Sequence, residues 1–251
     1  MLAGLLVVAG LRLGAEGAWG QAGPVLVSYS GVEVLLDRGD GLGWQVLTGG
    51  WQPSLSPDQS RVAFVRYEGI FTIGVDGGDL RTVLDTQAFG DLVGQPDYMA
   101  GTPVWTPDGR SLLFDWWSGF VCRLASVGVD GSDPRLLGMG GGIADGCWPS
   151  ALSPDGTGLL LTGTDDGQGL YLLRLDNGSH QGLTGRSNRG SWSPDGLWVA
   201  YTWRDVWGYY DEILGLGLVS ADGAVIRELA DLVRAMMMPQ PFEPKGLVTW
   251  S

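Results

Sequence analysis

Residues able to carry out catalysis are few in this sequence of 251 residues. His180 is the only histidine, so a Ser-His-Asp triad would have to use it, and a multi-histidine metal site is excluded. The motif Gly-x-Ser-x-Gly, which places a nucleophilic serine on a sharp strand-to-helix turn, is absent. Carboxylates lie close in sequence at Asp165 and Asp166 and at Asp205 and Asp211, a pattern compatible with a glycosidase pair or a calcium site but more typical of solvated loops. We therefore expect a protein that is not an enzyme, with no metal and no cofactor.

Aromatic and charged residues gather in a few segments that each follow an apolar run. Tyrosine and tryptophan present a large rigid surface with a polar group, which suits recognition of a protein, a peptide or a sugar. The candidate binding residues are Trp116, Trp117, Trp203, Arg204, Asp205, Trp207, Tyr209 and Tyr210. The four tryptophans of this set have a second interpretation, because tryptophan also fills the core between packed sheets. Four other tryptophans are expected in that core: Trp105, Trp148, Trp192 and Trp198.

A short repeated phrase defines the elements that must position these residues. It occurs at Ser56-Pro57-Asp58, Thr106-Pro107-Asp108-Gly109, Ser153-Pro154-Asp155-Gly156 and Ser193-Pro194-Asp195-Gly196, with a weaker copy at Glu243-Pro244-Lys245-Gly246. The prolines recur every 40 to 50 residues, the range in which four short strands and their turns form one propeller blade. In such a turn proline fixes φ, the aspartate side chain caps its own backbone, and glycine occupies the last position. This pattern predicts a structural turn role for Asp58, Asp108, Asp155 and Asp195.

Apolar runs after each phrase supply the strands. We number the strands of a blade A to D, so the phrase joins strand A to strand B, and a second Asp-Gly or Asn-Gly joins strand C to strand D. The 43 glycines disfavour long helices and supply tight turns. The expected fold is therefore all-β, a β-propeller of four-stranded antiparallel blades. Helix is expected only in residues 229–238.

The order aromatic-Ser-Pro-Asp-Gly, apolar strand, apolar strand ending in Asp-Gly, then Leu-Thr resembles the TolB-type WD40-like repeat. The unit that matches best is Ser191-Trp192-Ser193-Pro194-Asp195-Gly196-Leu197-Trp198-Val199-Ala200-Tyr201. The resemblance covers residues 23–251 and implies a propeller that binds a protein or peptide. Such repeats also form the gating domain of prolyl-oligopeptidase-like peptidases and occur in carbohydrate-active propellers, so these functions remain alternatives.

The two ends of the repeat region predict how the ring closes. Residues 25–49 supply strands B, C and D of a first blade without a phrase before them, and the sequence stops just after a final A–B turn. One closure has five blades, with a strand A near Pro241 completing the first. The other is a six-bladed ring cut short, which we favour because ending inside an apolar strand leaves an unpaired edge.

Residues 1–22 combine an apolar run with small residues before Gln21 and Ala22, as in a signal peptide. An uncleaved anchor and a misassigned start are the alternatives. Export predicts a periplasmic or extracellular protein, in which Cys122 and Cys147 form a disulfide or remain two thiols. The net charge of −13 argues against nucleic-acid binding and against attraction to anionic lipids, so no membrane insertion is expected beyond the leader.

A propeller of this kind has two unlike sides. The turn face carries the A–B and C–D turns, which are short and uniform. The loop face carries the B–C and D–A loops, which vary in length and hold the candidate binding residues together with Tyr67, Phe89, Asp91, Asp97, Tyr98, Asp145, Arg186, Arg189 and the segment 232–238. We expect an exported, non-catalytic propeller that recognises its partner through the loop face.

Overall fold

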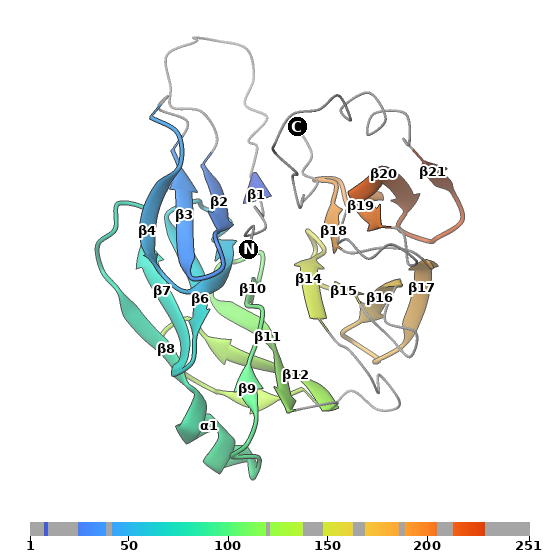
Figure 1. Ribbon diagram of the computed structural model, residues 1–251. Coiled ribbons are helices and arrows are strands. Elements are labelled where there is room, and N and C mark those ends of the chain that lie inside the picture. The colour runs from blue at the N-terminus through green and yellow to red at the C-terminus, as the bar shows by residue number, and fades with distance from the viewer. Residues whose placement is uncertain are drawn as a thin grey trace.

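The computed structural model describes residues 8–9, 25–38, 42–118, 121–137, 148–162, 169–185, 189–204 and 213–228. These residues form five antiparallel sheets, arranged as the blades of a five-bladed β-propeller (Figure 1). The predicted all-β propeller is confirmed. The favoured sixth, incomplete blade has no counterpart among the described residues. Residues near Pro241 and the weaker phrase at Pro244 lie outside them.

Each blade begins at the centre of the ring and ends at its rim. The strands, by blade, are β1 (Val8–Ala9), β2 (Leu26–Tyr29), β3 (Glu33–Asp37) and β4 (Gln45–Gly49); β5 (Trp51–Leu55), β6 (Arg61–Arg66), β7 (Gly69–Gly74) and β8 (Arg81–Asp85); β9 (Met99–Ala100), β10 (Val104–Trp105), β11 (Ser111–Ser118), β12 (Val121–Gly128) and β13 (Arg135–Leu136); β14 (Trp148–Leu152), β15 (Gly158–Thr162), β16 (Leu170–Arg174) and β17 (His180–Thr184); β18 (Arg189–Trp192), β19 (Trp198–Arg204), β20 (Ile213–Ser220) and β21 (Ile226–Glu228).

The first blade takes its inner strand from an unexpected part of the chain. Val8 and Ala9 of β1 pair with Val27 and Leu26 of β2. These two residues belong to the stretch predicted as a signal peptide. Among the described residues, β1 thus occupies the place where a strand near Pro241 was expected.

Blades pack face to face through their middle strands. Separate apolar clusters lie between blades 1 and 2, 2 and 3, 3 and 4, and 4 and 5. Strand β15 is buried along its whole length because it has a neighbouring blade on both faces, which explains its unbroken apolar run Gly158–Thr162. Trp105 spans one such interface by donating its indole N–H to the backbone oxygen of Ser54 at 2.9 Å.

The A–B turns also hold neighbouring blades in contact. Gly156 has φ +75°, and a Cβ atom there would lie 3.7 Å from Pro107 in the turn of the preceding blade. Gly196 and Pro154 repeat this arrangement one blade further on, with φ +71° and the same 3.7 Å distance. The repeated phrase therefore shapes each turn and also sets the approach of successive turns.

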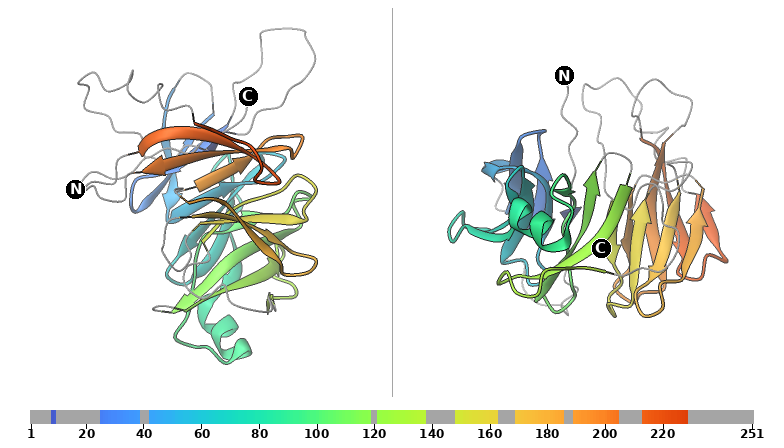
Figure 2. Two further views of the ribbon diagram at one scale, coloured as in Figure 1. Left: turned by 90° about the vertical axis from the view of Figure 1, so that its right-hand side faces the viewer. Right: turned by 90° about the horizontal axis from the view of Figure 1, so that it is seen from below.

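One helix was not predicted from the sequence. Helix α1 (Thr86–Val93) lies in the D–A connection between blades 2 and 3, beside β8 and β9 (Figures 1 and 2). Asp85 caps its first turn by accepting the N–H of Ala88 at 2.8 Å, and Gly94 ends it at φ 68°. The expected helix in residues 229–238 lies outside the described residues. No helix in the described ranges is long and apolar enough to span a membrane.

Candidate functional site

The turn face is built from aspartates that bind their own backbone. The Oδ1 atoms of Asp58, Asp108, Asp155 and Asp195 each accept a hydroxyl from the Ser or Thr two residues before, at 2.5 to 2.7 Å, and a backbone N–H from two residues after, at 3.0 to 3.1 Å. These hydrogen bonds, with the Ser153 hydroxyl as the largest cause, hold the pKa of Asp155 below its usual value. The carboxylates are thus occupied within the turns.

Large aromatic side chains are exposed on the loop face. Tyr67, in the B–C turn of blade 2, is 76% exposed and packs edge-on against Trp51 with ring centroids 4.8 Å apart. Trp117 near the end of β11 is 38% exposed, and Trp148 at the start of β14 is 48% exposed. Tyr67, Trp117 and Trp148 lie on the same side of three consecutive blades, and we call them the aromatic rim.

The structure separates the candidate residues Trp116 and Trp117. Trp116 has no exposed surface and packs between Phe89 of α1, with centroids 4.9 Å apart, and Tyr98 at 6.1 Å. Of the two interpretations of Trp116, binding residue or core residue, its burial supports the core one. Phe89, which was assigned to the loop face, is buried as well, because α1 packs its Phe89 side against this end of blade 3. Trp148 was expected in the core, and its exposure is a second correction.

The other candidates fall at the edge of the described region. Trp203 and Arg204 end strand β19, where they align with Gly215 and Ile213 of β20. Asp205, Trp207, Tyr209 and Tyr210 lie outside the described residues, as do Asp145, Arg186 and the segment 232–238. Their role in binding stays a prediction.

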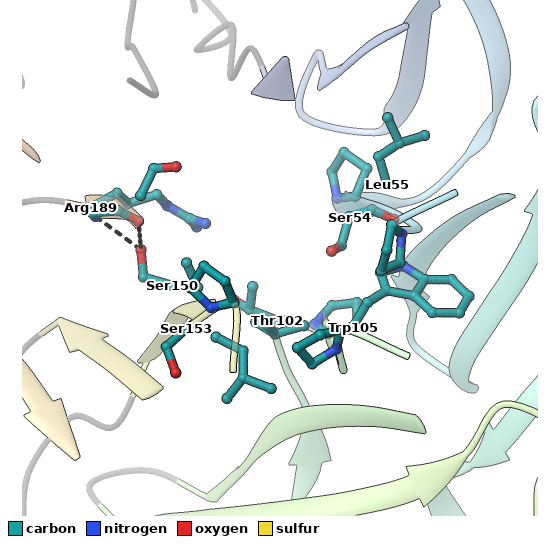
Figure 3. A pocket seen from close by; sticks show the side chains of 17 residues that line it. Ser54, Leu55, Thr102, Trp105, Ser150, Ser153 and Arg189 are labelled. Carbon is teal, nitrogen blue, oxygen red and sulfur yellow. Dashed lines mark hydrogen bonds between the residues drawn. The ribbon is translucent and has the colours of Figure 1, made fainter. Parts of the chain in front are cut away.

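The centre of the ring contains a cavity of about 320 Å³. Its wall is formed by the inner strands of blades 2 to 5 and by the prolines of the A–B turns of blades 2 to 4. Arg189, the first residue of β18, points its guanidinium into the cavity (Figure 3). Ser150 joins the inner strands of blades 4 and 5 by donating to the Gly190 oxygen at 2.9 Å and accepting the Gly190 N–H at 3.0 Å (Figure 3).

Asp115 of β11 lies buried behind this wall. It is 1% exposed, and neither carboxyl oxygen has a hydrogen-bond partner of ordinary geometry within the described chain. Burial raises the pKa of Asp115 to about 7, while backbone N–H groups of Asp115 and Thr102 and the charge of Arg189 act in the opposite direction. Gly101 makes room for the carboxyl, since a Cβ at that position would overlap it.

Arg189 is enclosed by the ring yet retains some contact with solvent through the cavity. Burial lowers the pKa of Arg189, and the proximity of Tyr29 and Asp115 partly offsets this. A guanidinium nevertheless stays protonated in proteins. The cavity is therefore lined by a permanent positive charge.

Two other sequence predictions concern a disulfide and a metal site. Cys122 of β12 is disulfide-bonded, and Cys147, the only other cysteine in the sequence, lies outside the described residues. The described ranges contain no group of three or more His, Cys, Asp or Glu side chains able to hold a metal ion.

Sequence reasoning missed the cavity and part of the aromatic rim. Arg189 was assigned to the loop face, whereas it is the first residue of β18, which lines the central cavity. The sequence analysis assigned no role to Asp115. The caps Asp85 and Gly94 are the signal that would have predicted α1, and α1 in turn would have predicted the burial of Trp116.

Comparisons with known proteins agree on the fold. No family model matches the chain, and no curated protein matches its sequence. TolB from Acinetobacter baumannii superposes with a TM-score of 0.60 and 18% identity, over 79% of this chain and 48% of that chain, so this chain spans about half its length. The nidogen/laminin complex gives 0.61 and 13%, over 91% and 78%. A puromycin hydrolase S511A mutant gives 0.54 and 18%, over 90% and 38%.

These structural neighbours thus include a TolB protein, a chain from a complex between two proteins and the propeller-sized part of a hydrolase. At identities under 25% they establish the β-propeller fold and nothing finer.

Proposed function

We propose that this chain is an exported, non-catalytic β-propeller that binds a protein or peptide through its loop face. The observation that carries the proposal is the aromatic rim, where Tyr67, Trp117 and Trp148 are 76%, 38% and 48% exposed. Exposed Tyr and Trp side chains are enriched where protein surfaces bind partners, since they bury a large area at low entropic cost. A rim spread over three blades matches the size of a protein or peptide surface better than that of a small molecule.

The contrast between the two sides of the ring supports the choice of face. Polar groups of the A–B turns bind one another, as Ser153, Asp155 and Thr157 illustrate. On the loop face, by contrast, Tyr67 contacts Trp51 edge-on while three quarters of the tyrosine surface stays in solvent. This surface is therefore available to a partner.

Two features support export. Residues 1–22 have the composition of a leader, with Val8 and Ala9 of this stretch paired to β2 in the first blade, and Cys122 is disulfide-bonded. Structural disulfides persist in oxidising compartments such as the periplasm or the extracellular space. The nidogen/laminin neighbour provides a precedent for this fold in a complex between two proteins.

A second candidate function is the propeller domain of a larger hydrolase. The observation in its favour is that this chain aligns over 90% of its own length with only 38% of the puromycin hydrolase chain. The gene sequence downstream of Ser251 tests this directly. An α/β-hydrolase domain there, with a Gly-x-Ser-x-Gly motif, would favour the peptidase function over the binding function.

The binding proposal is tested with the purified chain and a displayed library of random peptides. Clones selected on the wild-type chain are measured again on a Tyr67→Ala/Trp117→Ala double variant and on a turn-face control, Asp108→Ala. We expect binding to fall by roughly 2 kcal/mol or more on the rim variant and to be unchanged on the control. A glycan array of the same variants separates recognition of sugars from recognition of peptides.

A further inference from the structure

The guanidinium of Arg189 is unusual among the described arginines. Arg61 and Arg81 form ion pairs with Asp79, and Arg135 forms one with Asp133, all on the outside of the ring. The Arg189 guanidinium lies at the centre and forms no hydrogen bond or ion pair within the described part of the chain, although Asp115 and Tyr29 lie near enough to interact with its charge. A carboxylate that arrives from solution would give this enclosed cation the direct hydrogen bonds that it lacks.

We propose that the central cavity binds the carboxylate of a small organic monoanion, with Arg189 as the main contact. The planar fork of a guanidinium matches the two oxygens of a carboxylate. The rest of the wall is largely apolar, formed by residues such as Pro53, Pro103, Val104 and Leu152. This wall suits the hydrocarbon part of an organic acid.

The charges around the cavity favour a monoanion over a dianion such as phosphate. Arg189 is the one cationic side chain in the described lining, and Asp115 lies near enough to interact with it. A second negative charge on the ligand would therefore be unpaired and would be repelled by Asp115 when that group is ionised. The volume of about 320 Å³ is at the lower end of the range for small-molecule sites.

This site is independent of the proposed protein-binding function, because inner strands form it and the aromatic rim does not contribute to it. The carboxylate has two sources, a free small acid or the C-terminus of a bound peptide. Calorimetry distinguishes them with butyrate and benzoate as free acids, and with one short apolar peptide made with a free or an amidated C-terminus.

We expect butyrate or benzoate, or the free-acid peptide, to bind the wild-type chain saturably. Benzyl alcohol, inorganic phosphate and the amidated peptide should bind at least about tenfold more weakly. Arg189→Gln should weaken carboxylate binding by at least about tenfold. Arg174→Gln is the matched control, since Arg174 is exposed on β16, outside the cavity lining, and its loss should leave binding unchanged.

Arg189→Lys keeps the positive charge but removes the planar fork of the guanidinium, so it should also weaken binding. This variant replaces Arg189→Gln if the glutamine variant does not fold. The proposal is overturned if no carboxylate probe binds saturably, if phosphate or the uncharged probes bind as tightly, or if both Arg189 variants bind like the wild type. None of these results bears on binding at the aromatic rim.

Discussion

The hydroxyl of Ser153 donates a 2.6 Å hydrogen bond to the carboxylate of Asp155 and accepts the buried backbone N–H of Gly158 at 2.8 Å. One side chain thus satisfies a strand N–H and fixes the turn that precedes it. Asp155→Ala should lower the free energy of unfolding by about 1 kcal/mol, by analogy with a helix N-cap. Urea denaturation measures the change.

The control for this variant is Asp97→Ala, which alters an exposed aspartate in the D–A connection and should change stability by less than about 0.5 kcal/mol. Equal effects of the two substitutions would show that the turn hydrogen bonds do not stabilise the fold. The turn role of Asp155 further predicts unchanged peptide binding in Asp155→Ala.

Asp115 predicts a dependence of stability on pH. Its pKa in the folded chain is about 7 against an ordinary value of 3.8, so the folded state binds more protons between these values. The contribution of this carboxyl to stability is therefore complete below about pH 4 and is lost as the pH rises through 7. Asp115→Asn should stabilise the chain at pH 8 by about 4 kcal/mol at most, and by only about 1.6 kcal/mol at pH 5, where the folded carboxyl is still protonated.

Chemical denaturation of both chains at the two pH values provides the measurement. A stabilisation of the same size at pH 5 and pH 8 would contradict the idea that Asp115 is protonated at the lower pH.

Trp116 and Trp117 are neighbours in sequence with opposite expected behaviour. Trp116→Ala empties a fully buried site beside Phe89 and should cost about 3 to 5 kcal/mol. Trp117→Ala removes a side chain that is 38% exposed and should cost much less, about 1 kcal/mol. Thermal melts of the two variants compare them, and similar losses would place Trp117 in the core and remove it from the rim.

Trp116 and Trp117 also show which features of the fold can be predicted from sequence and which cannot. The turn around Asp155 was predictable because Pro, Asp and Gly act on their own backbone, within a few residues. Which of two adjacent tryptophans is buried depends on α1 and on the neighbouring blade, which are distant contacts. Likewise, Arg189 lies at the central cavity because five blades form a ring. The local sequence of residues 186–192 does not predict this position.

The disulfide at Cys122 predicts the thiol content. The denatured, unreduced chain should react with less than one equivalent of a thiol reagent, and the reduced chain with two. Reduction should lower the free energy of unfolding by about 3 kcal/mol, because a disulfide restricts the unfolded chain. Two reactive thiols before reduction would contradict the disulfide and weaken the case for export.

The central claim is that the loop face binds a protein or peptide. Its most direct measurement is the affinity of the strongest selected peptide for three chains: the wild type, a Tyr67→Ala/Trp148→Ala variant of the aromatic rim, and the turn-face variant Asp195→Ala. The account predicts a loss of about 30-fold or more on the rim variant, equal to roughly 2 kcal/mol, with Asp195→Ala unchanged. Equal affinity for the wild type and the rim variant, or a loss confined to Asp195→Ala, would contradict it.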